Sequence, residues 1–137
     1  GSLYTSILPN LLVTGIADAL GESDTTKVYV CNVATQKGET GGYTVADHVR
    51  ALQRHTFQNI ADYVVANDTP KELGSAFSGQ PVAVDGRQLG QVRLVTDNLV
   101  DPSHPVRHDS AKLAQTIIEV YHGKRKAGAR NSVAVEE

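Results

Sequence analysis

Polar side chains follow one short apolar run, an arrangement in which α/β proteins often place a ligand site. Residues 28–33 are apolar or small except for Asn32, which predicts a strand buried on both faces of a parallel sheet. A glycine-studded loop then leads into a helix. Ligands of open α/β sheets sit in the crevice beyond the carboxyl ends of the strands. We expect this crevice to be lined by Asn32, Thr35, Gln36, Gly38, Glu39, Thr40 and Thr44.

The start of the chain offers a second group of polar atoms. Ser2, Thr5 and Ser6 stand where a helix begins, and the free amides and dipole of a helix start favour anions such as phosphate. An ordinary helix cap explains the same residue types. The stretch by itself favours that plainer interpretation.

Candidates for acid–base or metal chemistry are fewer. Asp47 and His48 are neighbours at a helix start, but adjacent helical residues point in different directions and cannot form a direct dyad. Asp68, after a second strand, could hold a metal or belong to a turn. A zinc set is poorly supported because Cys31 is the only cysteine, and we interpret Cys31 as a small core residue. Arg107 could reach a phosphate or remain a solvated charge.

The elements that must position these residues alternate between helix and strand. We predict an amphipathic helix from about residue 2 to 20, broken or opened at Pro9, and a strand over 27–33. A helix from Thr44 to His55 follows, with Asp47 completing a capping-box-like pair. The next strand covers 62–66, and 72–77 is short helix or irregular.

The carboxyl-terminal part is less regular. Residues 81–84 and 92–95 are strand candidates that could form a hairpin or an edge around the Asp85-Gly86 turn, and residues 101–105 form a loop. A helix over 109–122 places Leu113, Ile117, Ile118 and Tyr121 on one face, and the composition of 123–137 predicts a disordered tail. The fold class is α/β.

Bulk properties narrow the functional class. The 137 residues suit one domain, and a net charge of -2 gives no footprint for nucleic acid. No apolar run approaches the roughly 20 residues of a membrane span, so we expect no membrane insertion. A single cysteine fits a reducing compartment, and we expect a cytoplasmic protein.

The motifs SLYTSILPNLL, VYVCNV, TQ, GET, GYT and ADHV, with VRHD before the last helix, resemble one group of proteins. It is the family of the gluconeogenesis factor (YvcK) and the 2-phospho-L-lactate transferase (CofD), with a closer likeness to the first branch. The resemblance runs from Gly1 to about Tyr121 and matches the carboxyl-terminal half of the family. It implies a Rossmann-like parallel or mixed sheet with flanking helices over 1–122, and a missing amino-terminal half with a glycine-rich nucleotide loop.

The resemblance also implies a site. Ser2, Leu3, Tyr4, Thr5 and Ser6 match a phosphate-proximal loop of the family, and Asn32, Thr35, Gln36 and the turn Gly38-Glu39-Thr40 match its cleft signature. Arg107 matches an arginine that could contact the nucleotide sugar. Ala34, where the family commonly has methionine, and Gly42 depart from the pattern without removing a polar group.

Three functions remain as hypotheses. The first is a regulatory protein that binds a UDP-sugar without turning it over and is linked to carbon metabolism, cell shape and envelope synthesis. The second is a metal-dependent transferase of deazaflavin coenzyme synthesis, with Asp47 or Asp68 on a divalent metal. The third is a truncated fragment that binds nothing and forms a homo-oligomer to cover an exposed sheet edge.

Overall fold

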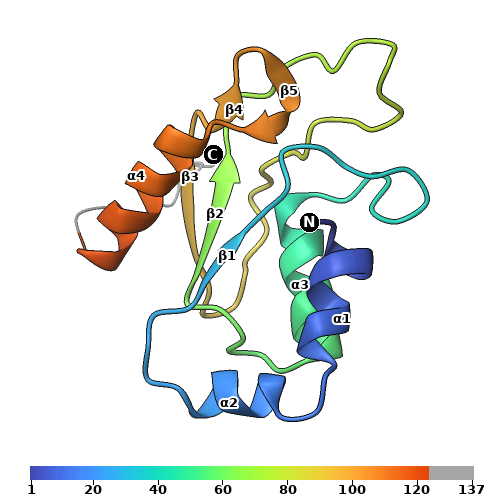
Figure 1. Cartoon of the computed structure of the whole chain (residues 1–137). Coiled ribbons are helices and arrows are strands. Elements are labelled where there is room, and N and C mark those ends of the chain that lie inside the picture. The colour runs from blue at the N-terminus through green and yellow to red at the C-terminus, as the bar shows by residue number, and fades with distance from the viewer. Residues whose placement is uncertain (124–137) are drawn as a thin grey trace, which may run out of the picture.

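A parallel sheet of three strands organises the chain in the computed structural model, which describes residues 1–123 (Figure 1). The strand order is β1-β2-β3, and both pairings are parallel. The predicted α/β class is therefore confirmed. The elements of the described chain, in order, are η1 (Leu3–Ile7, π-helical), α1 (Leu8–Leu11), α2 (Ile16–Glu22), β1 (Val28–Val30), α3 (Val45–His55), β2 (Tyr63–Asn67), β3 (Arg93–Asp97), β4 (Val100–Asp101), β5 (His104–His108) and α4 (Ser110–Tyr121).

The central strand β2 explains why the sheet has helices on both sides. All five of its residues are buried, and its side chains alternate between two apolar clusters. Val64 and Ala66 pack with residues of α3, whereas Tyr63 and Val65 pack with Val120 of α4. Figure 1 shows α4 on one side of the strands and α1 and α3 on the other. The result is a layered helix–sheet–helix arrangement.

Helix α3 forms where its sequence predicts it. The Thr44 hydroxyl accepts a hydrogen bond from the Asp47 amide at 3.3 Å, and the Asp47 carboxylate accepts one from the Thr44 amide at 3.0 Å. This reciprocal capping box satisfies two amides that the first helical turn leaves free. Val45, Val49 and Leu52 then bury their side chains against the sheet.

The hairpin proposed for residues 81–84 and 92–95 is wrong. Pro81 makes only an isolated antiparallel bridge to Ala34, and β3 instead pairs in parallel with β2. A hairpin does form later, at residues predicted to be a loop: β4 pairs with β5 in antiparallel fashion. Pro105 is tolerated there because β5 lies at the edge of a two-stranded sheet.

Two helix predictions need correction. The long helix from residue 2 to 20 is interrupted after Leu11 and resumes at Ile16, with Gly15 in the left-handed region at φ 86°. On α4, Ile118 and Tyr121 are 52% and 72% exposed, and the buried side chains are Thr116 and Val120. The predicted tail from 123 to 137 lies outside the described residues except for Gly123.

The described part of the chain contains no single helix long and apolar enough to cross a membrane. One pair of helical segments, Leu3–Leu11 and Ile16–Glu22, meets the length and composition criteria jointly, with a bend of 73° between them.

Candidate functional site

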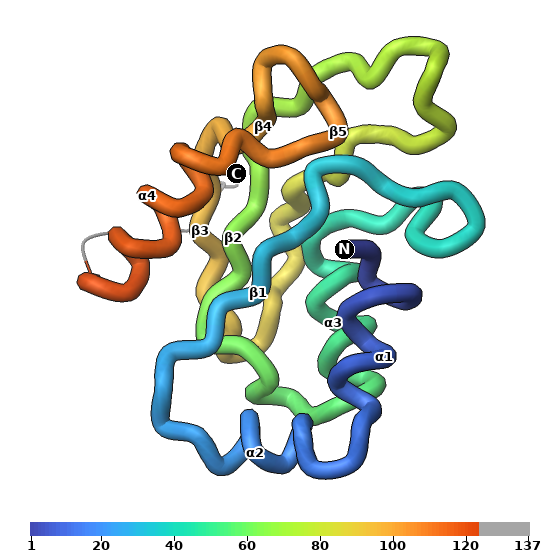
Figure 2. The backbone as a smooth tube through the Cα atoms, viewed as in Figure 1, coloured from blue at the N-terminus to red at the C-terminus, as the bar shows by residue number. Residues whose placement is uncertain are grey.

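Three segments meet at the carboxyl end of β1. The Asn32 side-chain amide donates to the Gly1 carbonyl at 3.2 Å, and the hydroxyls of Tyr4 and Tyr43 lie 2.9 Å apart. Figure 2 shows the amino terminus beside the loop that follows β1. We call this surface, formed by residues 1–6, Asn32 and residues 36–40, the carboxyl-edge site.

The helix start in this site has its cap. The Ser2 hydroxyl accepts from the Thr5 amide at 3.3 Å and also contacts the Thr5 hydroxyl. The Ser2 carbonyl accepts from the amides of Ser6 and Ile7 at 3.1 and 3.0 Å. Thr5 is exposed, and Ser2 and Ser6 are half-buried. The hydroxyls predicted for anion binding therefore lie in the segment whose first residue, Gly1, accepts from Asn32, and Thr5 is the exposed one of the three.

The loop after β1 is folded on itself. The Gln36 carbonyl accepts from the amides of Glu39 and Thr40 at 3.1 and 3.0 Å, and the Thr40 hydroxyl accepts from the Gln36 amide at 2.9 Å. Gly38 turns this loop with φ 82°, a conformation that favours glycine. Gln36 and Gly38 are exposed, so they are the part of the turn that a ligand can touch.

Three other predicted site residues have side chains that are buried inside the protein. Leu3 is fully buried in the core. Thr35 and Thr40 are 8% and 3% exposed, and the Thr35 hydroxyl accepts from the Gln80 amide at 2.9 Å. A ligand contact by these three residues would have to use backbone atoms, and their binding role stays a prediction.

Sequence reasoning missed the segment that covers this loop. Residues 68–92 contain no regular helix or strand, and they are tied to the loop after β1 by the Thr35 amide, which donates to the Gln80 carbonyl at 2.8 Å. Gly79 makes this approach possible, because a Cβ there would lie 2.1 Å from the Thr35 carbonyl oxygen. The local sequence pattern could not predict this contact, because Thr35 and Gln80 are 45 positions apart. Phe77, 44% exposed, lies two residues before Gly79.

Thr44 and Asp47 belong to a polar link with the same segment. The Arg87 guanidinium lies 2.9 Å from the Asp47 carboxylate and also contacts Asp85, and it donates to the Thr44 hydroxyl at 2.5 Å. These donors, Arg87 first and the Thr44 amide second, lower the pKa of Asp47 to about 2. The link joins residues 85–87 to the start of α3.

Arg107 stands on β5, which is attached to the end of β1. The neighbouring His108 places its Nε2 atom 3.2 Å from the Cys31 carbonyl oxygen. Successive strand residues point to opposite sides, and Arg107 is exposed. The structure thus brings Arg107 to the same end of the sheet as Asn32, with its guanidinium in solvent.

Buried titratable groups near this end are held neutral. Burial lowers the pKa of His48, whose Nδ1 atom lies 2.8 Å from the Thr44 carbonyl oxygen and whose Nε2 atom has no partner within the described residues. Burial raises the pKa of the Cys31 thiol to about 12. Since the thiolate is the reactive form, Cys31 is a core residue and not a nucleophile.

The aspartates proposed for a metal do not fit that role. Arg87 occupies the Asp47 carboxylate with a positive charge, which opposes a second cation. Asp68 accepts from the Thr69 hydroxyl at 3.0 Å on the exposed end of β2. Across residues 1–123, no three His, Cys, Asp or Glu side chains are grouped closely enough to hold a metal ion.

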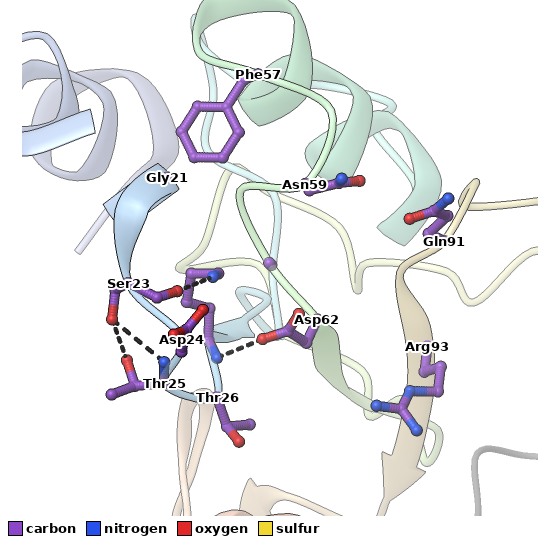
Figure 3. Close-up of a pocket in the computed structure, with 12 residues that line it drawn as sticks. Gly21, Ser23, Asp24, Thr25, Thr26, Phe57, Asn59, Asp62, Gln91 and Arg93 are labelled. Carbon is purple, nitrogen blue, oxygen red and sulfur yellow. Dashed lines mark hydrogen bonds between the residues drawn. The ribbon is translucent and has the colours of Figure 1, made fainter. Parts of the chain in front are cut away.

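A further pocket lies at the opposite edge of the sheet. Its volume is about 640 Å³, and it is formed by the segments that lead into β1, β2 and β3 (Figure 3). The rule that ligands sit beyond the carboxyl ends of strands did not predict it.

Comparison with known proteins identifies the family. The model of a family described as "2-phospho-L-lactate transferase CofD" matches residues 1–124. The chain belongs to the CofD family. One curated relative, the gluconeogenesis factor of Halalkalibacterium halodurans, is 41% identical over 127 residues, which cover 87% of this chain and 39% of that protein. The gluconeogenesis factor of Bacillus subtilis is 41% identical over 128 residues, covering 88% and 40%.

Solved structures agree with this CofD family fold. A crystal structure of a member of the UPF0052 family from Bacillus halodurans matches with a TM-score of 0.81 and 40% identity, covering 87% of this chain and 41% of that one. The chain thus spans about 40% of the length of these relatives. The predicted resemblance to one part of a larger protein of this family is confirmed.

Proposed function

We propose that the carboxyl-edge site forms part of a nucleotide-sugar site, in a cytoplasmic regulatory protein of the gluconeogenesis-factor type. The observation that carries the proposal is the hydrogen bond from Asn32 to the Gly1 carbonyl, which sets a capped helix start beside the loop after β1. Helix starts favour phosphate, and the exposed loop residues offer side-chain and backbone groups to a sugar or a base. The kinship with gluconeogenesis factors supports a role in carbon metabolism, and links to cell shape and envelope synthesis belong to the same proposal.

Part of this nucleotide-sugar site would come from the rest of the whole protein. The chain covers only about 40% of its relatives, and β1 has a strand on only one side within the described sheet. We therefore assign the remaining part of the whole protein as the second wall of the pocket. Binding would stabilise the folded protein by mass action.

The structure gives less support to the transferase alternative than to a nucleotide-sugar site. Its metal would depend on Asp47 or Asp68, and the Arg87 ion pair already holds the first of these. We accordingly favour binding without turnover, although the family model carries the transferase description.

Calorimetry on the whole protein tests the proposal with UDP-glucose as the probe. We expect binding that weakens about tenfold in Asn32→Ala, because the hydrogen bond that holds Gly1 at the site is lost. Arg50→Gln, an exposed arginine on α3 outside the site, is the control and should bind as the parent does. Absence of binding, or turnover of a deazaflavin precursor with a divalent metal, would contradict the proposal.

A further inference from the structure

The pocket at the amino edge of the sheet is a cavity that the carboxyl-edge site does not use. It is lined by segments from three places in the sequence: residues 21–27 before β1, residues 57–62 before β2 and residues 91–93 at β3 (Figure 3). We call it the amino-edge pocket. Its volume of about 640 Å³ lies within the range of small-molecule sites.

Backbone hydrogen bonds fix the three segments to one another. The Lys27 amide donates to the Asp62 carboxylate at 2.7 Å, and the Asp62 amide donates to the Lys27 carbonyl at 2.9 Å. The Arg93 amide donates to the Asp62 carbonyl at 2.9 Å. The pocket therefore has a preformed frame built on the first residues of the parallel strands.

Charges of both signs line this frame without neutralising one another. Asp24, Lys27, Asp62 and Arg93 all border the pocket, and none of them forms an ion pair with another described residue. Among residues 1–123, the Lys27 ammonium donates only to the Ser23 carbonyl, at 3.0 Å. The Arg93 guanidinium lies over the ring of Tyr63, 4.1 Å from its centroid, which leaves its N–H edges available.

Arg93 stands apart from the other three charges, since Lys27 bonds to Asp62 through its amide and to the carbonyl of Ser23, next to Asp24, through its ammonium. The side with Asp24, Asp62 and Lys27 keeps one net negative charge. Figure 3 shows Arg93 on one side of the pocket and the carboxylates of Asp24 and Asp62 on the other. In this view Asn59 lies above Asp62, Gln91 lies above Arg93, and Phe57 lies at the upper rim. The side-chain amides of Asn59 and Gln91 have no hydrogen-bond partner among residues 1–123, so they can donate and accept toward a guest.

We propose that the amino-edge pocket binds a small zwitterion of the size of a dipeptide. A ligand ammonium would pair with Asp24 and Asp62, and a ligand carboxylate would accept from Arg93 in the planar two-bond geometry that guanidinium favours. Asn59 and Gln91, on the same wall of the pocket above Asp62 and Arg93, would hydrogen-bond other polar groups of the ligand. Two acidic and two basic side chains give the lining no net charge, which disfavours a phosphate or another multiply charged anion.

Titration of the ¹⁵N-labelled whole protein with alanyl-alanine tests this site by nuclear magnetic resonance. We expect shifts confined to the amides of residues 23–27, 57–62 and 91–93 and to the side-chain NH₂ signals of Asn59 and Gln91. N-acetyl-alanyl-alanine and alanyl-alaninamide each lack one charge. Each should bind about tenfold or more weakly, because a charge-assisted hydrogen bond is lost.

Variants separate this pocket from nonspecific binding. Asp24→Asn should weaken the dipeptide about as much as removal of its ammonium, and Arg93→Gln about as much as removal of its carboxylate. Arg93→Lys keeps the charge and should bind between parent and Arg93→Gln. Asp18→Asn, on exposed α2 outside the pocket, is the matched control. The spectrum of each variant reports directly whether it is folded.

Several results would overturn the proposal. These are the absence of shifts up to roughly 10 mM dipeptide, equal binding of the charged and capped dipeptides, shifts that map to other residues, or equal shifts with inorganic phosphate. The proposal does not rest on the nucleotide-sugar site, which lies at the other edge of the sheet. Calorimetry can therefore show no binding of UDP-glucose while the titration shows binding of the dipeptide, and UDP-glucose can bind while the dipeptide does not.

Discussion

At the scale of single residues, Gly79 limits how the irregular segment reaches the loop after β1. The Thr35 hydroxyl and carbonyl face this glycine from across the contact. Any side chain there meets backbone atoms and not the movable end of a side chain. The φ of Gly79 is not in the left-handed region, so the backbone conformation does not require glycine there. The lack of space for a Cβ atom does.

Replacing Gly79 with alanine should destabilise the protein. The added Cβ would lie 2.1 Å from the Thr35 carbonyl oxygen, and overpacking of this kind costs about 1–3 kcal/mol in the free energy of unfolding. Gly86→Ala is the control, since nothing lies within 4 Å of its Cβ position. Urea unfolding of both variants measures the difference, and equal midpoints would contradict the contact.

Asp47 carries a pH-dependent contribution to stability. Its pKa is held at about 2 in the folded protein, chiefly by Arg87, against about 3.9 in an unfolded chain. A depressed folded pKa means that the stabilisation is complete above the unfolded pKa and disappears as the pH falls through the folded one. The contribution should therefore be lost between about pH 4 and pH 2.

Asp47→Ala should lower the free energy of unfolding by about 1 kcal/mol at pH 7, through loss of the reciprocal cap. The gap between parent and variant should shrink as the pH falls from about 4 toward 2, because the parent then loses the same charge. Thermal melts across this range measure it, with Glu72→Gln as the control at an exposed position. A gap that stays constant with pH would show that the carboxylate charge contributes nothing.

At the scale of elements, local signals were predicted well and long-range pairings were not. The capping box of α3 needs only Thr44 and Asp47, three residues apart, and it was identified from sequence. The pairing of β3 with β2 joins segments about 30 residues apart, and a turn at Asp85-Gly86 suggested a hairpin instead. Turn residues show where a chain can reverse, but the partner of each strand is decided by the burial of whole faces.

The face of α4 shows the same limit. The helical period admits several apolar stripes on this helix, and tertiary packing selects the one that contains Val120, 2% exposed, over the one that contains Ile118, 52% exposed. The candidate site shows a related limit. Its helix start and loop were predicted, whereas the ties from Gln80 and Arg87 come from a segment without a periodic pattern.

The packing of α4 can be tested with two truncations of similar size. Val120→Ala should cost about 2 kcal/mol in the free energy of unfolding, because it removes buried methyl groups from the cluster with Val65 and Val95. Ile118→Ala should stay within about 0.5 kcal/mol of the parent. Denaturant unfolding compares them, and a larger loss in Ile118→Ala would mean that the opposite face of α4 packs on the sheet.

At the scale of the whole molecule, the described chain leaves apolar surface uncovered. Within residues 1–123, β1 has a partner strand on one side only. Leu12, Val13 and Ile16, at the bend between α1 and α2, are 64%, 53% and 39% exposed. Open sheet edges and apolar patches favour association with another chain.

The isolated 137-residue chain should therefore self-associate in a concentration-dependent way. Light scattering over a dilution series measures the mass, and the double variant Leu12→Ser with Ile16→Ser should lower it because the exposed bend becomes polar. Ile118→Ser, an exposed apolar residue on α4 outside both surfaces, is the matched control and should leave the mass unchanged. A strictly monomeric parent at every concentration would contradict association through either one.

The bond between Asn32 and the first residue has a practical consequence for anyone who purifies this chain. The Gly1 carbonyl is held by Asn32 at the carboxyl end of β1, so any chain ahead of Gly1, whether a histidine tag or the preceding part of a longer protein, would start at that surface. The imidazoles and linker of a tag would then compete with added ligands at that surface. Affinity handles at the amino terminus should be cleaved before any titration, and a cleaved sample should be compared with an uncleaved one.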